Sequence, residues 1–456
     1  MDIEGKPVEN KLGVMPMRRL VITMSIPLML SLLVQSLYNI VDSIFVARLS
    51  EQALTATTLV YPVQILMIAL AVGTGVGINA LISQLLGRGQ TQQVGYTAVT
   101  GIILSLVSSA VFVLCALLFS DFIVAWLTAD ITIAPLCKTY LTICMMFCGG
   151  TFIETMGQRF LQASGKTELS MISLIAGAIT NIILDPIMIF GYFGMQAMGI
   201  RGAAIATVIG QWVGAAVALT LNYFLNPEVQ MKFRGFRLEW KTVTAVYRVG
   251  LPTIITQALG SVMNFAMNAI LLTYSGTAVA FFGVYYKLQN FLLMPMNGLG
   301  QAAIPIVGYN YGAKNMRRIE ENIRITLTGG LGMALLATAL FLAFPRRLLS
   351  LFNASVDMLA VGVPAIRIIC GTFSFATVTM ILGYCASGLG NGIINMTGTG
   401  LRQVVLLIPA VYILLKYAGI EYVWYAMWFS ETLAAMSSVM MFRKELKHTR
   451  LLCLSE

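Results

Sequence analysis

The chain has 456 residues, of which 58% are hydrophobic and 11% are charged. A soluble globular protein of this length does not need so apolar a composition, so the chain is expected to lie largely in lipid. The net charge of +10 does not indicate a nucleic-acid partner, because the basic residues gather in polar segments between apolar runs. The seven cysteines form no CxxC pair, and the single histidine, His448, lies in a charged C-terminal segment. A histidine metal site is therefore excluded.

Apolar runs recur along the whole chain and predict an all-α polytopic membrane protein with twelve transmembrane helices. The predicted spans are residues 18–47, 53–77, 93–119, 131–162, 169–191, 200–226, 246–274, 278–305, 317–343, 357–387, 394–418 and 421–443. An even number of spans leaves both termini on one side of the membrane. If that side is the cytoplasm, it collects twenty lysines and arginines, against seven on the other side. This positive-inside bias predicts cytoplasmic termini, and acidic residues before a long first run argue against a cleaved signal peptide.

The longest polar connection, Asn226–Lys241, divides the spans six and six. A shift of 225 residues gives ten identities between positions 27 and 87, among them Pro27 with Pro252 and Gly73 with Gly298. This internal repeat predicts two pseudo-symmetric six-helix lobes related by an axis along the membrane normal. The expected parts are a cytoplasmic N-tail 1–17, an N-lobe 18–226, a cytoplasmic linker 227–245, a C-lobe 246–443 and a cytoplasmic C-tail 444–456.

Charged and amide side chains inside the spans are costly in lipid and indicate function. Four polar residues of the first span share one helical face: Gln35, Tyr38, Asn39 and Asp42. The fifth span carries Asn181 and Asp185 one turn apart, and the sixth carries Thr207. Topology puts Asp42, Asp185 and Thr207 about 7–11 Å inside the outer boundary. Two carboxyls with amide and hydroxyl oxygens at one depth predict a proton or Na⁺ site, although each acid could instead be a structural hydrogen-bonding group.

The other intramembrane charges allow two interpretations each. Glu154 is predicted near the cytoplasmic end of its span, where it either forms a structural ion pair with Arg159 or serves the substrate pathway or gating. Lys287 and Glu431 are predicted near the midplane of the C-lobe, where they either pair with each other or contact substrate.

The C-lobe has amides where the N-lobe has acids. The polar residues on its seventh span are Gln257, Asn264 and Asn268. The repeat aligns Asp42 with Met267 and Asp185 with Ala410. The ion chemistry is therefore expected in the N-lobe, and the C-lobe amides are candidates for the substrate pathway.

Two glycine-containing motifs do not predict nucleotide binding. Gly165-Lys166-Thr167 has Phe160 where a phosphate-binding loop needs glycine, so ATP is not an expected partner. Gly73-Thr74-Gly75-Val76-Gly77 lies in an apolar run, where glycines indicate close helix packing.

Several motifs together resemble the multidrug and toxic compound extrusion (MATE) transporters over about residues 15–445. They are Asp42, Leu161-Gln162-Ala163-x-Gly165, Asn181-Ile-Ile-Leu-Asp185-Pro186, Gly202-Ala-Ala-Ile-Ala-Thr207 and Pro305-Ile-Val-Gly-Tyr-Asn-Tyr-Gly312-Ala313. The resemblance implies two six-helix lobes in a V shape that export cationic or amphipathic compounds against H⁺ or Na⁺. In the DinF-like branch with N-lobe acids, the residues matching Asp42, Asn181, Asp185 and Thr207 form the cation site. Another branch places essential acids in the seventh and tenth spans, where this chain has Gln257 and no acid between Ala365 and Ser387.

The sequence thus favours a secondary-active multidrug antiporter of the bacterial cytoplasmic (inner) membrane, with a role in xenobiotic transport and antibiotic resistance. A monomer is expected, with membrane lipids and small-molecule substrates as partners and no cofactor beyond the coupling ion H⁺ or Na⁺. The alternative is a lipid or lipid-linked oligosaccharide flippase of the same superfamily, which should carry more cationic residues in its cavity than Lys287. An intramembrane enzyme would need paired catalytic clusters that the sequence lacks, and a pure scaffold would not explain four buried acids.

Overall fold

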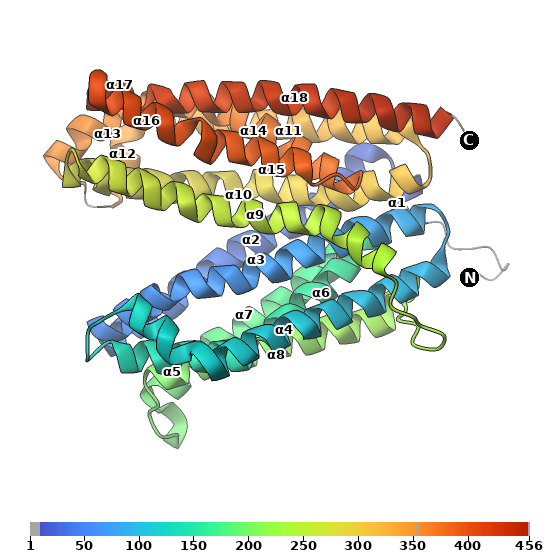
Figure 1. The fold of residues 1–456 in the computed structure, drawn as a ribbon, viewed down its shortest axis with the longest axis horizontal. Helices are drawn as coiled ribbons and strands as arrows, with labels where there is room; N and C mark the ends of the chain where they lie inside the picture. Colours follow the sequence, from blue (N-terminus) through green and yellow to red (C-terminus); the bar gives the residue numbers. More distant parts are fainter. Residues whose placement is uncertain (1–9, 353, 455–456) are drawn as a thin grey trace. The chain divides into compact units, whose positions relative to one another are not determined.

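A computed structural model describes residues 10–352 and 354–454, and these residues form helices and connecting turns without a strand. The helices of the first half are α1 (Lys11–Val14), α2 (Met17–Leu49), α3 (Glu51–Gly87), α4 (Thr91–Leu127), α5 (Ala134–Met146), α6 (Gly149–Ala163), α7 (Thr167–Phe190) and α8 (Ile200–Leu225). Those of the second half are α9 (Trp240–Leu272), α10 (Gly276–Gly312), α11 (Met316–Ala343), α12 (Pro345–Ser350), α13 (Val356–Ile369), α14 (Phe373–Gly388), α15 (Ile393–Gly400), α16 (Leu407–Tyr417), α17 (Ile420–Val423) and α18 (Tyr425–Leu454). Short 3₁₀ turns lie at Tyr192–Gly194, Pro227–Val229 and Cys370–Thr372, and Leu401–Val405 forms a π-helical turn. The predicted all-α polytopic fold is confirmed (Figure 1).

In the described part of the chain, ten helices or continuous helix pairs are long and apolar enough to cross a membrane. The number is eleven if α5 and α6, which are bent by 45° at their junction, form one span. The predicted twelfth span corresponds to α18, which has 30 residues. Glu431 and several hydroxyl residues lower the hydropathy of α18, although its length suffices to cross the hydrocarbon core. The helix continues to Leu454, so most of the predicted C-tail is helical, whereas residues 1–9 of the predicted N-tail lie outside the described residues.

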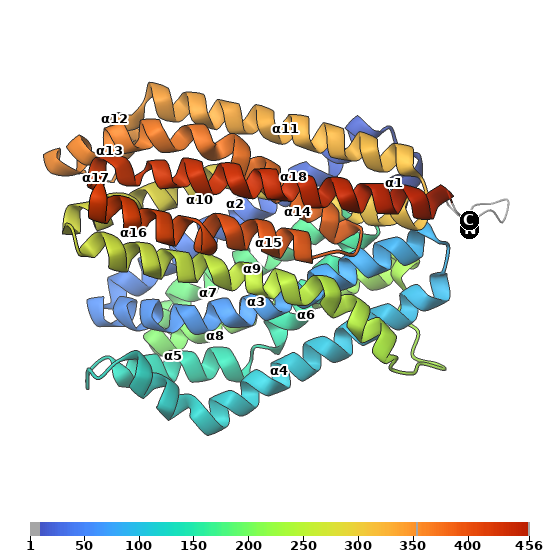
Figure 2. The same cartoon turned by 45° about the horizontal axis from the view of Figure 1, so that its top comes forward.

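The chain divides into two compact units, whose boundaries differ from the predicted lobes. Unit 1 contains Asn10 and Leu30–Gly250, and unit 2 contains Lys11–Met29 and the chain from Leu251 onward. The first half of α2 therefore belongs to unit 2, and the linker with the first turns of α9 belongs to unit 1. Within unit 2, α11, α14 and α18 run side by side (Figure 2).

Glycines on α3 and α10 explain this division, because they let a second helix approach the backbone closely. In unit 1, a Cβ atom added to Gly77 would lie 2.2 Å from the carbonyl oxygen of Val246 in α9. In unit 2, a Cβ atom added to Gly298 would lie 2.8 Å from the backbone nitrogen of Met29 in α2. The close packing predicted for the α3 glycines is therefore present. The repeat-related α10 accepts α2 in the same manner.

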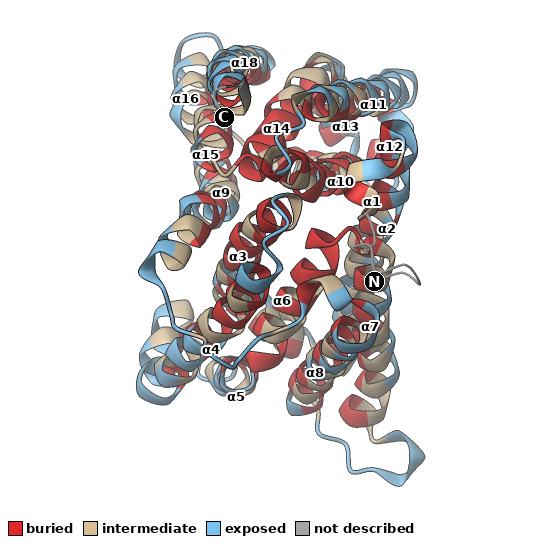
Figure 3. Ribbon diagram, turned by 90° about the vertical axis from the view of Figure 1, so that its right-hand side faces the viewer, coloured by how far each residue is buried: buried red, intermediate tan, exposed pale blue. Residues whose placement is uncertain are grey.

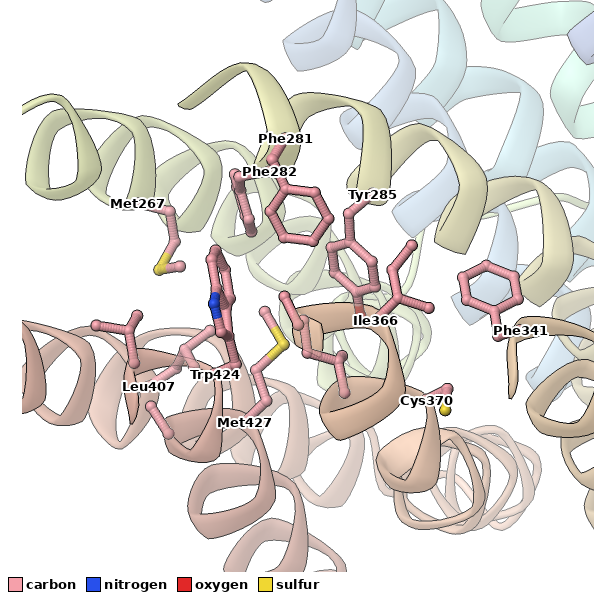
Figure 4. Close-up of a cluster of buried hydrophobic side chains, with 14 of the residues drawn as sticks. Met267, Phe281, Phe282, Tyr285, Phe341, Ile366, Cys370, Leu407, Trp424 and Met427 are labelled. Carbon is pink, nitrogen blue, oxygen red and sulfur yellow. The ribbon is translucent and has the colours of Figure 1, made fainter. Parts of the chain in front are cut away.

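Each unit has its own apolar core, and α3 and α10 are the most buried long helices (Figure 3). The main core of unit 1 gathers residues of α2 to α8, including the buried Tyr140 and Phe152. The main core of unit 2 contains Phe281, Tyr285 and Trp424, which meet from α10 and the turn before α18 (Figure 4). The Phe281 and Trp424 rings pack edge to face, with centroids 5.0 Å apart.

The predicted span 131–162 is broken between α5 and α6. The break frees backbone groups, and Trp212 Nε1 of α8 donates to the carbonyl oxygen of Phe147 at 3.2 Å. Gly149 and Gly150 follow, where an added Cβ would lie 3.2 Å and 3.0 Å from the Trp212 side chain. This contact holds α6 against α8 and sets the position of Glu154.

Substituting Gly77 by alanine tests whether the close approach of α3 and α9 stabilises unit 1. An alanine in a helix is normally favourable over glycine by about 0.5–1 kcal/mol, but here its Cβ would collide with a backbone oxygen that cannot move alone. We expect Gly77→Ala to destabilise the protein by about 1–3 kcal/mol in a thermal unfolding assay. Gly283→Ala in α10 is the matched control, because an added Cβ there has no heavy atom within 4 Å. Equal stability of the two variants would contradict this packing account.

Candidate functional site

Two acids from distant spans meet inside unit 1. The carboxyl groups of Asp42 in α2 and Asp185 in α7 lie within hydrogen-bonding distance of each other. Asp185 has no exposed surface. The Oδ1 atom of Asp42 is buried and has no hydrogen-bond partner among the described residues. The pair therefore retains a free acceptor oxygen in an environment that disfavours an unsatisfied polar atom.

Asn181 and Thr207 lie beside this pair of acids. The Nδ2 atom of Asn181 lies 3.4 Å from Oδ1 of Asp185 and 3.4 Å from Oγ1 of Thr207. With the amide turned over, Asn181 donates to Oδ2 of Asp185 at 3.2 Å and accepts from the Thr207 backbone N–H at 3.2 Å. The Thr207 hydroxyl donates to the carbonyl oxygen of Ala203 at 3.0 Å. In either orientation Asn181 joins the acid pair to α8.

Two residues of this network were not predicted from the sequence. The buried Tyr140 of α5 lies next to Thr207 and to Gln64 of α3, within electrostatic range of Asp42. Gln64 also donates to the sulfur of Cys144 at 3.7 Å. Both are polar side chains inside predicted apolar spans, and this is the signal in the sequence that marks them.

Small residues in α7 and α8 bring the site together. A Cβ atom added to Gly210 of α8 would lie 2.9 Å from the carbonyl oxygen of Gly177 in α7, and one added to Gly202 would lie 2.4 Å from that of Met188. The two helices can therefore approach until their backbones touch. Asn181 lies one turn after Gly177, which places its amide opposite Thr207.

The chemistry of this arrangement follows from its charges. Two adjacent carboxylates repel each other, so the pair is favoured when it holds a proton or a cation between its oxygens. The amide and hydroxyl oxygens nearby are ligands that suit a hard monovalent cation. Within the described residues, no three His, Cys, Asp or Glu side chains gather as a metal site. The chemistry of the four side chains suits the binding of one positive charge.

The rest of the predicted α2 face lies beside this site. Tyr38 is within electrostatic range of Asp42, Asp185 and Glu154. Gln35 is half-buried and Asn39 is exposed within unit 1. Tyr38 thus lies near both the acid pair and the third acid of the unit.

The Glu154 side chain of α6 packs against α7 and α8. Its carboxylate lies 2.5 Å from the place where a Cβ on Gly214 of α8 would be, and 3.5 Å from the corresponding place at Gly177 of α7. Gly177 is four residues, about 6 Å along the helix axis, from Asn181. The glycines create the space, so α6 brings Glu154 to the middle of α7. Gln158 donates to Glu154 Oε1 at 3.1 Å, whereas Arg159 Nη1 donates to Gln162 at 2.8 Å.

In unit 2, the ion-pair partner of Glu431 differs from the one predicted from the sequence. Glu431 of α18 lies 3.5 Å from Nε of Arg402, and both side chains are largely buried. No ion pair joins Lys287 to Glu431 among the described residues, so the predicted pair is wrong, and Lys287 is exposed within unit 2. Arg402 lies in the π-helical turn Leu401–Val405, inside the apolar helical segment Ile393–Tyr417, and its side chain reaches Glu431 of α18.

The other predicted C-lobe residues do not form a second acid site. Gln257 is exposed within unit 2, and Asn264 and Asn268 are half-buried. The Oδ1 atom of Asn268 has no hydrogen-bond partner among the described residues. Tyr285 lies within electrostatic range of Glu431 and Arg402, and its buried hydroxyl likewise has no hydrogen-bond partner in the described chain.

A polytopic helical fold with buried ionisable groups in both units defines an integral membrane transport protein. The sequence profile of the MatE family matches residues 27–187 and again residues 252–413. The chain therefore belongs to the MatE family, and its two matches begin 225 residues apart, at the predicted repeat.

Similar proteins agree with this assignment. The multidrug export protein MepA of Staphylococcus aureus strain MSSA476 is 24% identical over 435 residues, which cover 93% of both chains. An outward-facing structure of a multidrug resistance MATE family transporter of the MOP superfamily aligns with a TM-score of 0.90 at 24% identity, covering 98% of this chain and 99% of that one. A MOP superfamily transporter from Pyrococcus furiosus aligns with a TM-score of 0.89 at 24% identity, covering 98% and 99%. These structures show that the fold is shared.

A double-mutant cycle tests the Arg402–Glu431 pair. Removing one partner leaves a buried charge without compensation, so Arg402→Met and Glu431→Gln should each lower stability by about 3–5 kcal/mol. The double variant should recover much of that loss in thermal unfolding. Lys287→Met is the control and should have little effect on stability because Lys287 is exposed. Additive losses for Arg402 and Glu431 would rule out the pair.

Proposed function

We propose that this protein is a secondary-active multidrug exporter that moves cationic or amphipathic compounds out of the cell in exchange for H⁺ or Na⁺. The observation that carries the proposal is the contact between the carboxyl groups of Asp42 and Asp185, with a buried oxygen of Asp42 left without a partner. Asn181 and Thr207 supply further oxygens at the same point. The name of the MepA relatives, multidrug export protein, supports the substrate class.

Ion binding is coupled to export if the acid pair stabilises one conformation of the protein when it is empty and another when it holds an ion. Uptake of a proton or Na⁺ removes the repulsion between the carboxylates, and its release restores that repulsion. The pair joins α2 to α7, so a change in its charge changes the free energy of the contact between these helices. An ion that binds one conformation more tightly shifts the equilibrium toward it, and this shift can drive export.

The cellular setting belongs to the same proposal. The distribution of Lys and Arg supports a bacterial cytoplasmic membrane with both termini inside the cell. We infer a monomer whose partners are membrane lipids and small-molecule substrates, with no cofactor beyond the coupling ion.

The lipid or lipid-linked oligosaccharide flippase is the less favoured function. A flippase needs free cationic side chains in its central cavity, deep in the membrane, to hold a phosphate-bearing substrate, but Arg402 is paired with Glu431. Lys287 is the remaining candidate that the sequence analysis named. Proteoliposomes loaded with a fluorescent cation or a labelled lipid distinguish these functions, because the proposal requires ion-gradient-dependent movement of the cation.

Neutralising either acid should abolish coupling. We expect Asp42→Asn and Asp185→Asn each to lower ion-driven efflux from proteoliposomes to background, because an amide can neither take up a proton nor pair with Na⁺ as a carboxylate does. Efflux is measured under an imposed pH gradient and, separately, under a Na⁺ gradient, and the active gradient identifies the coupling ion.

Asn181→Ala serves as a graded comparison for these variants. An amide contributes a dipole rather than a charge, so its loss should weaken ion dependence without abolishing transport. Asp121→Asn in α4 is the control for loss of an acid, because the Asp121 side chain is exposed and pairs with Lys138 away from the site. Near-normal driven efflux in Asp42→Asn or Asp185→Asn, with folding unchanged, would refute the shared ion site.

Glu154→Gln should change substrate transport more than it changes the dependence of transport on the ion. Gln158 already satisfies one Glu154 oxygen, and an amide can keep the packing against Gly214. We expect a change of substrate range or apparent affinity, with a pH or Na⁺ profile like that of the unsubstituted protein. An ion profile that shifts as in Asp42→Asn would instead assign Glu154 to the coupling site, one helical turn away.

A further inference from the structure

Unit 2 contains a groove that the proposed export function does not use. It encloses a cavity of about 750 Å³ between the first half of α2 and the helices α10 and α11. The volume falls in the range of small-molecule sites, about 300–1,000 Å³. The residues along it are Arg18, Val21, Ile22, Ser25, Ile26 and Met29 of α2, Leu299 of α10, and Glu321, Arg324, Ile325, Thr328, Gly329 and Met333 of α11.

One end of the groove is charged. Arg18 lies at the second residue of α2, while Glu321 and Arg324 lie in the first turns of α11. Arg18 and Arg324 are exposed, and neither has an ion-pair or hydrogen-bond partner for its guanidinium among the described residues. Glu321 interacts electrostatically with Arg318, whose guanidinium already donates to the carbonyl oxygens of Leu12 and Met15.

The remainder of the groove is apolar and has the length of one membrane leaflet. From Arg18 to Met29 the helix rises about 17 Å, which is close to half of the roughly 30 Å hydrocarbon thickness. The deep end closes where Met29 packs on Gly298. Ile22 and Ile26 of α2, which line the groove, are 57% and 49% exposed.

Ser25 is the polar exception in this apolar part. Its side chain is 2% exposed, and its hydroxyl has no hydrogen-bond partner among the described residues. A buried hydroxyl without a partner is unfavourable. Since Ser25 lines the cavity, a ligand carrying an ester carbonyl would supply the missing acceptor.

We propose that this groove binds one phospholipid whose headgroup carries a phosphate and a primary ammonium, with an acyl chain lying between α2 and α11. Arg18 and Arg324 contact the phosphate, and Glu321 accepts from the ammonium. Ser25 donates to an ester carbonyl. The arrangement of two cations and one anion matches the charges of this headgroup better than those of an acidic lipid, which has no group for Glu321.

A lipid in this position would act on the helix that carries Asp42. The first half of α2 belongs to unit 2, and the same helix continues from Leu30 into unit 1. An acyl chain held along residues 18–29 fixes that half of the helix against α11. The lipid is a bound component and not the exported substrate, so this proposal does not depend on the export function.

Native mass spectrometry of the delipidated full-length protein tests the proposal. The lipids are dioleoyl-phosphatidylethanolamine, -phosphatidylglycerol and -phosphatidylcholine, each titrated separately. Phosphatidylethanolamine should be retained at the lowest concentration, because choline has no N–H to donate and glycerol has no positive charge. Arg18→Gln and Arg324→Gln should each weaken binding of all three lipids by about tenfold, since each removes a charge-assisted contact with the shared phosphate. Arg19→Gln, at an exposed position next to Arg18 and outside the groove, should have no effect.

Two further variants separate a specific site from general lipid contact. Gly329→Trp should fill the groove and prevent retention, because a Cβ there faces the cavity with only Leu299 at 3.6 Å. Gly332→Trp on the same helix is the matched control, since its Cβ meets nothing within 4 Å and the residue does not line the groove. Glu321→Gln should remove the preference for phosphatidylethanolamine over phosphatidylglycerol. Equal lipid retention by the two tryptophan variants would show that the lipid does not bind in the groove. An unchanged preference for phosphatidylethanolamine in Glu321→Gln would contradict the headgroup assignment.

Discussion

The cost of placing a charge in lipid governs this structure, because every ionisable side chain within the spans must find a partner or a role. In unit 1 that constraint acts on Asp42 and Asp185, which lie in contact and have like charge. Asn181, Thr207, Tyr140 and Gln64 surround the pair with hydrogen-bonding groups. The backbone contact between Gly177 and Gly210 brings these groups within reach of one another. Close helix packing thus creates the polar site as well as the apolar core.

The two units treat buried charge in different ways, although they derive from one repeat. In unit 2, Arg402 supplies Glu431 with an internal cation, so that pair is neutral without an external ion. In unit 1, the contacts described for the acid pair involve only amide, hydroxyl and carboxyl groups. Duplication preserved the close packing of α3 on α9 and of α10 on α2, as Gly77 and Gly298 show, while the chemistry of the halves diverged. This asymmetry supports our assignment of ion coupling to unit 1 and a stabilising role to the unit 2 pair.

Helices α2 and α9 each contribute residues to both units, so they join the part of the chain with the acid pair to the part with the Arg402–Glu431 pair. The α2 helix starts beside the groove of unit 2 and later carries Asp42. Its Pro27 lies close to the change of unit, as Pro252 does in α9. Proline removes a backbone donor and weakens the helix locally. A helix weakened at the change of unit can bend there while both of its halves keep their packing.

The sequence by itself determined the all-α membrane fold, the repeat of 225 residues and the grouping of Asp42, Asn181, Asp185 and Thr207. These follow from apolar run length, from a constant shift and from helical rise, which are local or one-dimensional properties. Only the tertiary structure decided that Glu431 pairs with Arg402 rather than Lys287, because depth in the membrane does not fix which way a helix faces. Arg402 lies in the π-helical turn Leu401–Val405, which neither composition nor periodicity signals. Tertiary packing likewise decided what surrounds Glu154, since the space for its carboxylate comes from glycines on two other helices.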